Sequence, residues 1–110
     1  MDISATAKNI KSPPRKIRLI LRELPGMRVD QAMNMLRYLP SPHARDVAKV
    51  VRSAAANAEN NYQISPDELV IKAAVAGDGM KLKRFRARAR GRVGSIIKRY
   101  CHVTVTVGEA

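Results

Sequence analysis

A chain of 110 residues is long enough for one small domain, and its formal net charge of +12 attracts polyanions, with nucleic acid as the first candidate and an anionic membrane surface as the second. Hydrophobic residues make up 45% and aromatic residues only 4%, so a core is possible but must be built from aliphatic side chains. The single cysteine, Cys101, excludes an intramolecular disulfide. No run of about 18 apolar residues is present to span a membrane, and the N-terminus lacks the apolar core of a signal peptide. We therefore expect a cytosolic protein or one from an organelle of similar chemistry.

The first residues predict a strand and a helix. Residues 2–10 alternate loosely between apolar and polar side chains, which favours a short strand. Ser12 followed by Pro13 and Pro14 is typical of a helix start, with a capping side chain and prolines near the first turn. One face of this helix carries Ile17, Ile20, Leu21 and Leu24, and the other carries Arg15, Arg18 and Arg22. Pro25-Gly26 ends it.

Two further helices are expected before residue 62. Asp30 can cap the second, whose buried stripe consists of Ala32, Met35, Leu36 and Leu39. Ser41 and Pro42 are typical of the cap and first position of a third helix that runs to about Asn61. Its buried face consists of Val47, Val51, Ala54 and Ala58, where the alanines allow another backbone to approach closely.

The second half of the chain predicts strands. Residues 63–68 form a turn, and residues 69–76 read as a strand. Residues 77–79, Gly-Asp-Gly, allow a bend or bulge, and residues 102–107, HVTVTV, alternate strictly and predict the clearest strand. The fold class is therefore α+β, with three helices packed on one face of a small three-stranded antiparallel sheet.

Residues 81–99 hold nine basic side chains, and no acidic residue occurs between Asp78 and Glu109. Since strands flank this stretch, the simplest connection is a long hairpin with its turn near residue 90, which would place Val75 opposite Val105. Residues 79–101 would then project beyond the sheet as a basic two-stranded arm, and about ten extended residues reach roughly 30 Å. Arginines at 84, 86 and 88 would line one side of the arm.

No apolar pattern supports this arm, and an isolated two-stranded ribbon is only marginally stable in water. A surrounding polyanion would supply the missing counter-charge, and arginine suits that role because its guanidinium makes bidentate phosphate contacts. Phe85 either stacks on an unpaired base or packs onto the opposite strand of the arm. The alternative reading of such a charge run, a solvated surface or a disordered tail, fits poorly with its position between two well-patterned strands.

The other candidate sites either allow two interpretations or show no recognisable functional pattern. The basic face of the first helix, with Lys16, is either a second RNA contact or a solvated surface. Asn57, Asn60 and Asn61 either hydrogen-bond ribose and base edges or terminate the third helix. His43, His102 and Cys101 form no metal-ligand or nucleophile pattern, and no paired carboxylates are present, which argues against a nuclease. A membrane-active hairpin is disfavoured because bulky apolar residues do not alternate with the arginines.

Four segments together resemble the bacterial form of the L-twenty-two family of large-subunit ribosomal proteins. They are SPPRKIRLI at 12–20, SAAANAENNY at 53–62, LKRFRARARGR at 82–92 and KRYCHVTVTV at 98–107. The resemblance implies a single ribosomal domain over 1–110, a long β-hairpin at about 79–101 that penetrates large-subunit rRNA, and a tip that lines the nascent-peptide exit tunnel. It implies a structural role in the cytoplasmic large subunit, without catalysis, cofactor, metal, membrane or small-molecule substrate. The implied partners are large-subunit rRNA, neighbouring ribosomal proteins and the nascent polypeptide.

Site residues follow from this resemblance and from the basic pattern. The expected rRNA-binding residues are Arg15, Lys16, Arg18, Arg22, Lys81, Lys83, Arg84, Arg86, Arg88, Arg90, Arg92, Lys98 and Arg99. The expected tunnel-lining tip consists of Ala87, Arg88, Ala89, Arg90, Gly91 and Arg92.

Overall fold

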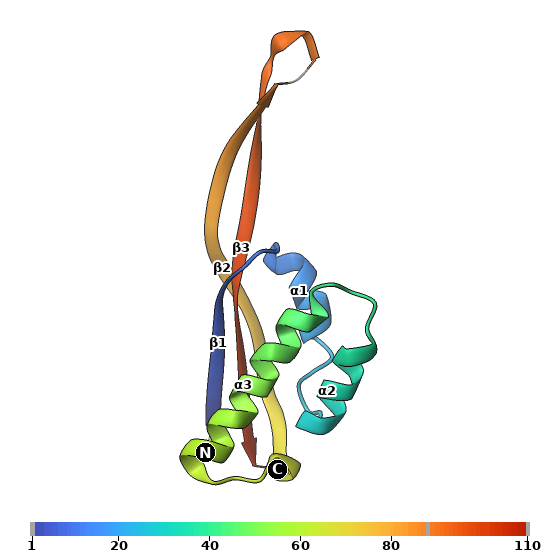
Figure 1. The fold of residues 1–110 in the computed structure, drawn as a ribbon, viewed down its shortest axis with the longest axis vertical. Coiled ribbons are helices and arrows are strands. Elements are labelled where there is room, and N and C mark those ends of the chain that lie inside the picture. Colours follow the sequence, from blue (N-terminus) through green and yellow to red (C-terminus); the bar gives the residue numbers. More distant parts are fainter. Residues whose placement is uncertain (1, 88, 110) are drawn as a thin grey trace.

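The computed structural model describes residues 2–87 and 89–109, and it has an elongated shape that measures 61 × 26 × 17 Å (Figure 1). In chain order the elements are β1 (Asp2–Ile10), α1 (Pro14–Leu21), α2 (Val29–Tyr38), α3 (Ala44–Tyr62), the 3-10 turn η1 (Pro66–Glu68), β2 (Leu69–Ala87), the 3-10 turn η2 (Ala89–Gly91) and β3 (Val93–Glu109). The predicted α+β class is confirmed. The long pair β2 and β3 extends past the helices as a protruding arm.

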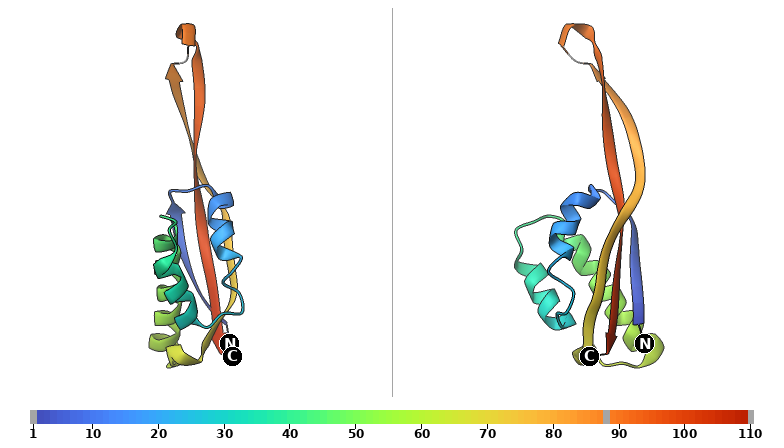
Figure 2. Two further views of the ribbon diagram at one scale, coloured as in Figure 1. Left: turned by 90° about the vertical axis from the view of Figure 1, so that its right-hand side faces the viewer. Right: turned by 180° about the vertical axis from the view of Figure 1, so that it is seen from behind.

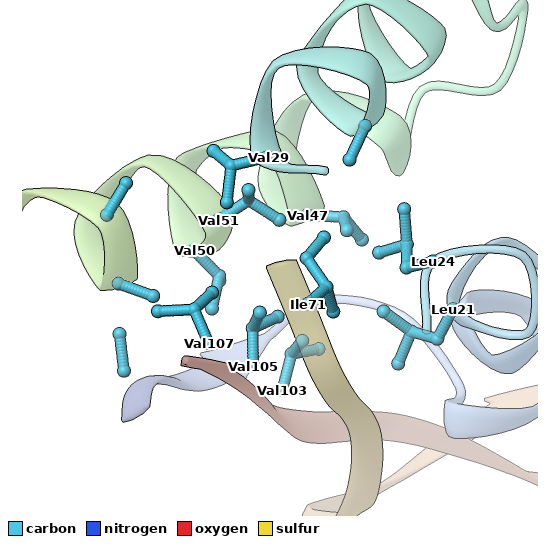
Figure 3. Packing of buried hydrophobic residues seen from close by; sticks show 14 of the residues in the cluster. Leu21, Leu24, Val29, Val47, Val50, Val51, Ile71, Val103, Val105 and Val107 are labelled. Carbon is cyan, nitrogen blue, oxygen red and sulfur yellow. The ribbon is translucent and has the colours of Figure 1, made fainter. Parts of the chain in front are cut away.

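The sheet is antiparallel with the order β1-β3-β2, and the three helices cover one of its faces (Figure 2). Burial alternates along the central strand β3 within the sheet. Cys101, Val103, Val105 and Val107 are fully buried, while the residues between them point to the other face and are half-buried. These side chains meet Ile71 of β2 and the helices in one apolar core (Figure 3). The strict alternation of HVTVTV therefore predicted the inward face correctly.

The helices contribute the predicted apolar faces to this core. Ile17 of α1 and the α3 residues Val47, Val51, Ala54 and Ala58 are all fully buried. Leu24 is also fully buried, although α1 ends before it at Leu21. In α2, Ala32 and Leu36 are buried, whereas Met35 and Leu39 are half-buried at the edge. The small residues of α3 let it lie close to the sheet, where the Asn57 side chain donates to the Ser4 carbonyl of β1 at 3.5 Å.

The predicted helix caps are wrong at all three starts. The residues that precede the helices are Pro13, Arg28 and His43, and none of them makes a capping side-chain hydrogen bond. Ser12 is buried instead, where its hydroxyl donates to the Pro13 carbonyl and lies 3.4 Å from His43 Nε2. These contacts join the start of α1 to the start of α3, so packing rather than capping decides the conformation of Ser12.

The other predicted boundaries shift by a few residues. Asp30 lies inside the first turn of α2, where its carboxylate still complements the helix dipole. Ser41 accepts a hydrogen bond from the His43 backbone N–H at 3.3 Å, and α3 begins only at Ala44 rather than at Pro42. Helix α1 ends at Leu21, before Pro25-Gly26.

The hairpin turn lies where predicted, but the predicted pairing of Val75 with Val105 is wrong, because Val75 pairs with Thr104. The cause is a bulge between the pairs Asp78–Cys101 and Lys81–Arg99, where Gly79 and Met80 lie opposite a single residue, Tyr100. The one-residue shift leaves Val75 59% exposed although Val105 is fully buried.

Glycine is required at one position of this bulge. A Cβ atom at Gly79 would lie 3.0 Å from both the carbonyl carbon and oxygen of Tyr100, which is closer than ordinary side-chain contacts allow. At Gly77 a Cβ atom would meet nothing within 4 Å. The bulge therefore depends on close approach of the two backbones at Gly79, and it marks the point where the sheet gives way to the arm.

Candidate nucleic-acid interface

The register of the arm decides which side chains share a face. We define the arm as residues 81–87 of β2 and 93–99 of β3, with residues 89–92 as its described tip. Because directly paired residues point to the same side of an antiparallel ribbon, two sets result. One face carries Leu82, Arg84, Arg86, Gly94, Ile96 and Lys98. The other carries Lys81, Lys83, Phe85, Ala87, Val93, Ser95, Ile97 and Arg99.

Positive charge therefore occupies both faces of the arm. Each described basic residue of the arm and tip is solvent-exposed, namely Lys81, Lys83, Arg84, Arg86, Arg90, Arg92, Lys98 and Arg99. The predicted shared side of Arg84 and Arg86 is confirmed, whereas Arg88 lies outside the described residues. Within this register only Lys81 and Arg99 place like charges directly opposite each other, since Lys83 and Arg84 pair with Ile97 and Ile96. Such spacing limits repulsion between the strands while leaving two charged surfaces.

The sequence predicts no apolar pattern that supports the arm, whereas the register places a small, exposed apolar stripe on one face. Phe85 pairs with Ser95, and Val93 and Ile97 are its diagonal neighbours on the same face. These three side chains are 76%, 70% and 45% exposed, respectively. They form an apolar stripe between the basic residues, but they are too little buried to support the arm by themselves. The alternation of Val93, Ser95 and Ile97 was the signal in the sequence that could have revealed it.

The tip is a tight turn made from small and basic residues. Arg90 and Gly91 have φ angles of 62° and 72°, both in the left-handed region, and the Arg92 backbone N–H donates to the Ala89 carbonyl at 3.5 Å. Ala87, Ala89, Arg90, Gly91 and Arg92 are all exposed. Left-handed backbone at a non-glycine residue is uncommon, and here it lets the tight turn present the Arg90 side chain to solvent.

The basic face of α1 lies at the base of the arm, and Arg15, Lys16, Arg18 and Arg22 are all exposed on it. Arg18 additionally donates two hydrogen bonds, at 2.8 and 3.2 Å, to the carbonyl of Ala76 in β2, just before the bulge. Its guanidinium thus ties α1 to the strand that continues into the arm. The sequence predicted the charge of this face but gave no sign of that contact.

The two histidines and the cysteine take part in local structure. His102 Nδ1 accepts a hydrogen bond from the Asn9 backbone N–H at 3.1 Å, within the register shift between the pairs Ala7–Val103 and Ile10–Cys101. Burial raises the pKa of the Cys101 thiol, which disfavours the reactive thiolate. Within residues 2–87 and 89–109, no three His, Cys, Asp or Glu side chains gather as metal ligands. Also within the described part of the chain, no helix is long and apolar enough to cross a membrane.

The last turn of α3 does not decide between the two readings of its asparagines. Asn57 donates to β1, as described above, while Asn60 and Asn61 are exposed. The helix ends at Gln63 in the left-handed conformation, whose backbone N–H donates to the carbonyls of Ala58 and Glu59. The exposed amides of Asn60 and Asn61 thus remain available to a partner.

Acidic residues gather at the end opposite the arm. Asp2 and Glu109 lie at the sheet end that holds both chain termini, through the pairs Asp2–Gly108 and Leu69–Glu109 (Figure 1). Asp67, Glu68 and Glu109 line a shallow hollow there with Arg28. Positive charge is therefore concentrated toward the arm, which attracts a polyanion more strongly than the far end does.

Comparison with known proteins agrees with this geometry. Residues 5–108 match the family model described as ribosomal protein L22p/L17e. The chain is 42% identical to a large ribosomal subunit protein uL22 of Herpetosiphon aurantiacus, over 99% of this chain and 96% of the relative. Proteins of the same name from Dehalococcoides mccartyi and Clostridium novyi are 44% and 45% identical, over 99% of this chain and 100% and 98% of the relatives. The chain belongs to the ribosomal protein L22p/L17e family.

Proposed function

We propose that this protein is a structural, non-enzymatic constituent of the large ribosomal subunit in the cytoplasm, where it binds large-subunit (23S) rRNA and supports its assembly. The observation that carries the proposal is the arm, which has exposed basic residues on both faces and no acidic residue anywhere in its sequence. Such a ribbon gains stability where phosphates surround it, because they neutralise both charged faces at once. Its relatives are named as large-subunit proteins, which supports the same assignment.

The interface divides into two parts. The arm and tip would contact rRNA through Lys81, Lys83, Arg84, Arg86, Arg88, Arg90, Arg92, Lys98 and Arg99, and α1 through Arg15, Lys16, Arg18 and Arg22. Phe85 is free to stack on an unpaired base because most of its ring is exposed. Arg18 has a second role, since its bonds to Ala76 hold α1 against the base of the arm.

Crosslinking in cells tests the rRNA assignment. Living cells that carry a tagged copy of the chain are irradiated. The chain is then purified, and the RNA attached to it is sequenced. We expect the chain to sediment with the large subunit and its crosslinks to fall on 23S rRNA. An Arg84→Glu/Arg86→Glu variant should lose crosslinks, whereas Asp67→Lys, at the far end of the sheet, should keep them. Absence from the large subunit, or crosslinks mainly to other RNA, would contradict the proposal.

We further propose that the tip lines the nascent-peptide exit tunnel. Arg86 pairs directly with Gly94, so residues 87–93 can be replaced by Asn-Gly to close a shorter hairpin. The replaced side chains offer little packing area, so the variant should fold and enter the large subunit. Ribosome profiling should then reveal altered passage of some nascent chains, or altered sensitivity to tunnel-directed inhibitors. A variant that enters the subunit with both readouts unchanged would place the tip outside the tunnel.

A further inference from the structure

A groove between α2 and α3 forms a second surface with distinct chemistry. Helix α2 packs mainly against α3 rather than against the sheet, and the two lie side by side on the outer side of the molecule (Figures 1 and 2). The groove between them has a volume of about 600 Å³. Its α3 wall is formed by Arg45, Ala48 and Arg52, on a different side of the helix from the sheet-facing Val47 and Val51. The groove is therefore separate from both the core and the arm.

The floor of the groove is aliphatic and its rim is basic. The half-buried Met33, Leu39 and Ala48 contribute apolar surface, and Leu36 and Ala44 are buried beneath it. Arg37, Arg45 and Arg52 supply three guanidinium groups around this floor, and no acidic residue lines the groove. The Arg37 guanidinium lies 5.9 Å from the centre of the Tyr38 ring, which orients it by a cation–π contact.

This combination differs from the arm in the partner that it fits. Single-stranded RNA is bound by aromatic stacking platforms and by hydrogen bonds to base edges. The lining of the groove contains no aromatic residue, and Asn34 and Ser41 are its only uncharged polar side chains. An aliphatic floor instead suits leucine-like anchors, as when an amphipathic helix lies in a groove between two helices. Carboxylates beside those anchors would meet the three rim arginines and set the register.

We propose that the groove between α2 and α3 is a docking site for an acidic amphipathic segment of a neighbouring protein in the ribosomal particle. The proposal rests on the proposed function, since the neighbour is encountered in the assembled large subunit. Apolar side chains of the segment cover Met33 and Leu39, and its carboxylates pair with Arg45 and Arg52. The groove between α2 and α3 thus binds protein, while the arm and α1 bind RNA.

Photocrosslinking from within the groove tests this proposal on the full chain in assembled subunits. Asn34, an exposed groove residue, is replaced by benzoylphenylalanine, which reacts with C–H bonds of protein and of ribose alike. The same photoreactive residue at Glu59, exposed near the far end of α3, is the background control. The crosslink is then measured with Arg45→Glu or Arg52→Glu added. Lys72→Glu is the matched control, because Lys72 is an exposed basic residue of β2 that does not line the groove.

We expect the Asn34 position to crosslink to one protein segment that carries both acidic and aliphatic residues. Reversal of either rim charge should lower that yield about tenfold, and Lys72→Glu should leave it unchanged. Crosslinks to rRNA, a yield no higher than at Glu59, or a captured segment without acidic residues would each overturn the proposal. A chain that is absent from the large subunit altogether would contradict the proposed function itself, which distinguishes the two failures.

Discussion

The body and the arm are built from the same two strands but are stabilised in different ways. In the body, β3 buries every second side chain against three helices, and Ile71 of β2 is fully buried in the same layer. In the arm, the same strands stay paired from Lys81–Arg99 to Ala87–Val93 with no layer on either face. Strand pairing is therefore common to the body and the arm. The two regions differ because only the body has a layer of helices that covers the sheet.

The contrast shows where each region obtains its stability. Burial of apolar area contributes about 25 cal/mol per Å², and almost all of that area lies in the body. The arm instead presents charges that repel one another until anions lie beside them. We therefore expect the body to fold alone and the arm to become rigid on binding, and four measurements test this difference.

Amide hydrogen exchange should give the largest difference between the two regions. In the isolated protein, amides at 47–58 and 103–107 should exchange only through global opening, which costs about 5–15 kcal/mol in typical domains. Amides at 81–87 and 93–99 should exchange through local opening at a cost near zero, and so faster by several orders of magnitude. Mass spectrometry of peptic fragments measures both regions in one sample. Equal protection of the two would mean that the arm supports itself.

Two isoleucines on the paired strands should differ strongly in their effect on stability. Ile71→Ala removes a fully buried side chain and should lower the free energy of unfolding by about 2–5 kcal/mol. Ile97→Ala, at a side chain that is 45% exposed, should change it little. Urea unfolding followed by circular dichroism provides the measurement. A comparable loss from Ile97→Ala would reveal that the apolar stripe of the arm contributes to the fold.

Two glycines beside the bulge offer a matched pair at the boundary between the regions. Gly79→Ala places a Cβ atom against the Tyr100 backbone and should destabilise the protein by about 1–3 kcal/mol, as overpacking does. Gly77→Ala meets open space and should be nearly neutral. Thermal unfolding compares the two, and NMR shifts of residues 93–99 report any change in the register of the arm. If both substitutions behave alike, the close approach at Gly79 is not what shapes the bulge.

The smallest expected effect concerns the salt dependence of RNA binding. Each phosphate contact contributes a slope of roughly −0.7 to −0.9 to a plot of log affinity against log salt. Arg84→Ala/Arg86→Ala should therefore flatten the slope for a 23S rRNA fragment by about 1.4 to 1.8. Arg45→Ala/Arg52→Ala removes equal charge from the groove and should leave the slope nearly unchanged. Equal flattening by the two pairs would mean that the arm and the groove bind RNA alike.

Much of the fold could be predicted because local periodicity and burial coincide. The strict alternation of residues 102–107 and the helical spacing of Val47, Val51, Ala54 and Ala58 each identified an inward face correctly. The turn near residue 90 followed from symmetric strands on either side of a stretch with glycines. Each of these segments is a single helix or strand with one side against the core. The spacing of its apolar residues therefore indicates directly which side is buried.

Caps and contacts between segments were less predictable from residue types. Ser12 has the right chemistry for a helix cap but is held by His43, which lies more than thirty residues away in sequence. Arg18 was predicted as a surface charge, and the structure adds its bonds to Ala76. In both cases a distant partner competes with the local role, and a local pattern carries no information about that partner.

By itself, the sequence determined the charge, the order of helices and strands, the apolar faces and the existence of a basic hairpin. All of these depend on composition and on periods of two or 3.6 residues. The glycines at 77 and 79 indicated a bend or bulge, but only the tertiary structure decided its register, which displaced the pairing of Val75 by one residue. Tertiary structure alone decided the groove that brings Arg37 of α2 beside Arg45 and Arg52 of α3. A bulge inserts one residue without a fixed sequence mark, and a groove arises only when two separate helices pack together.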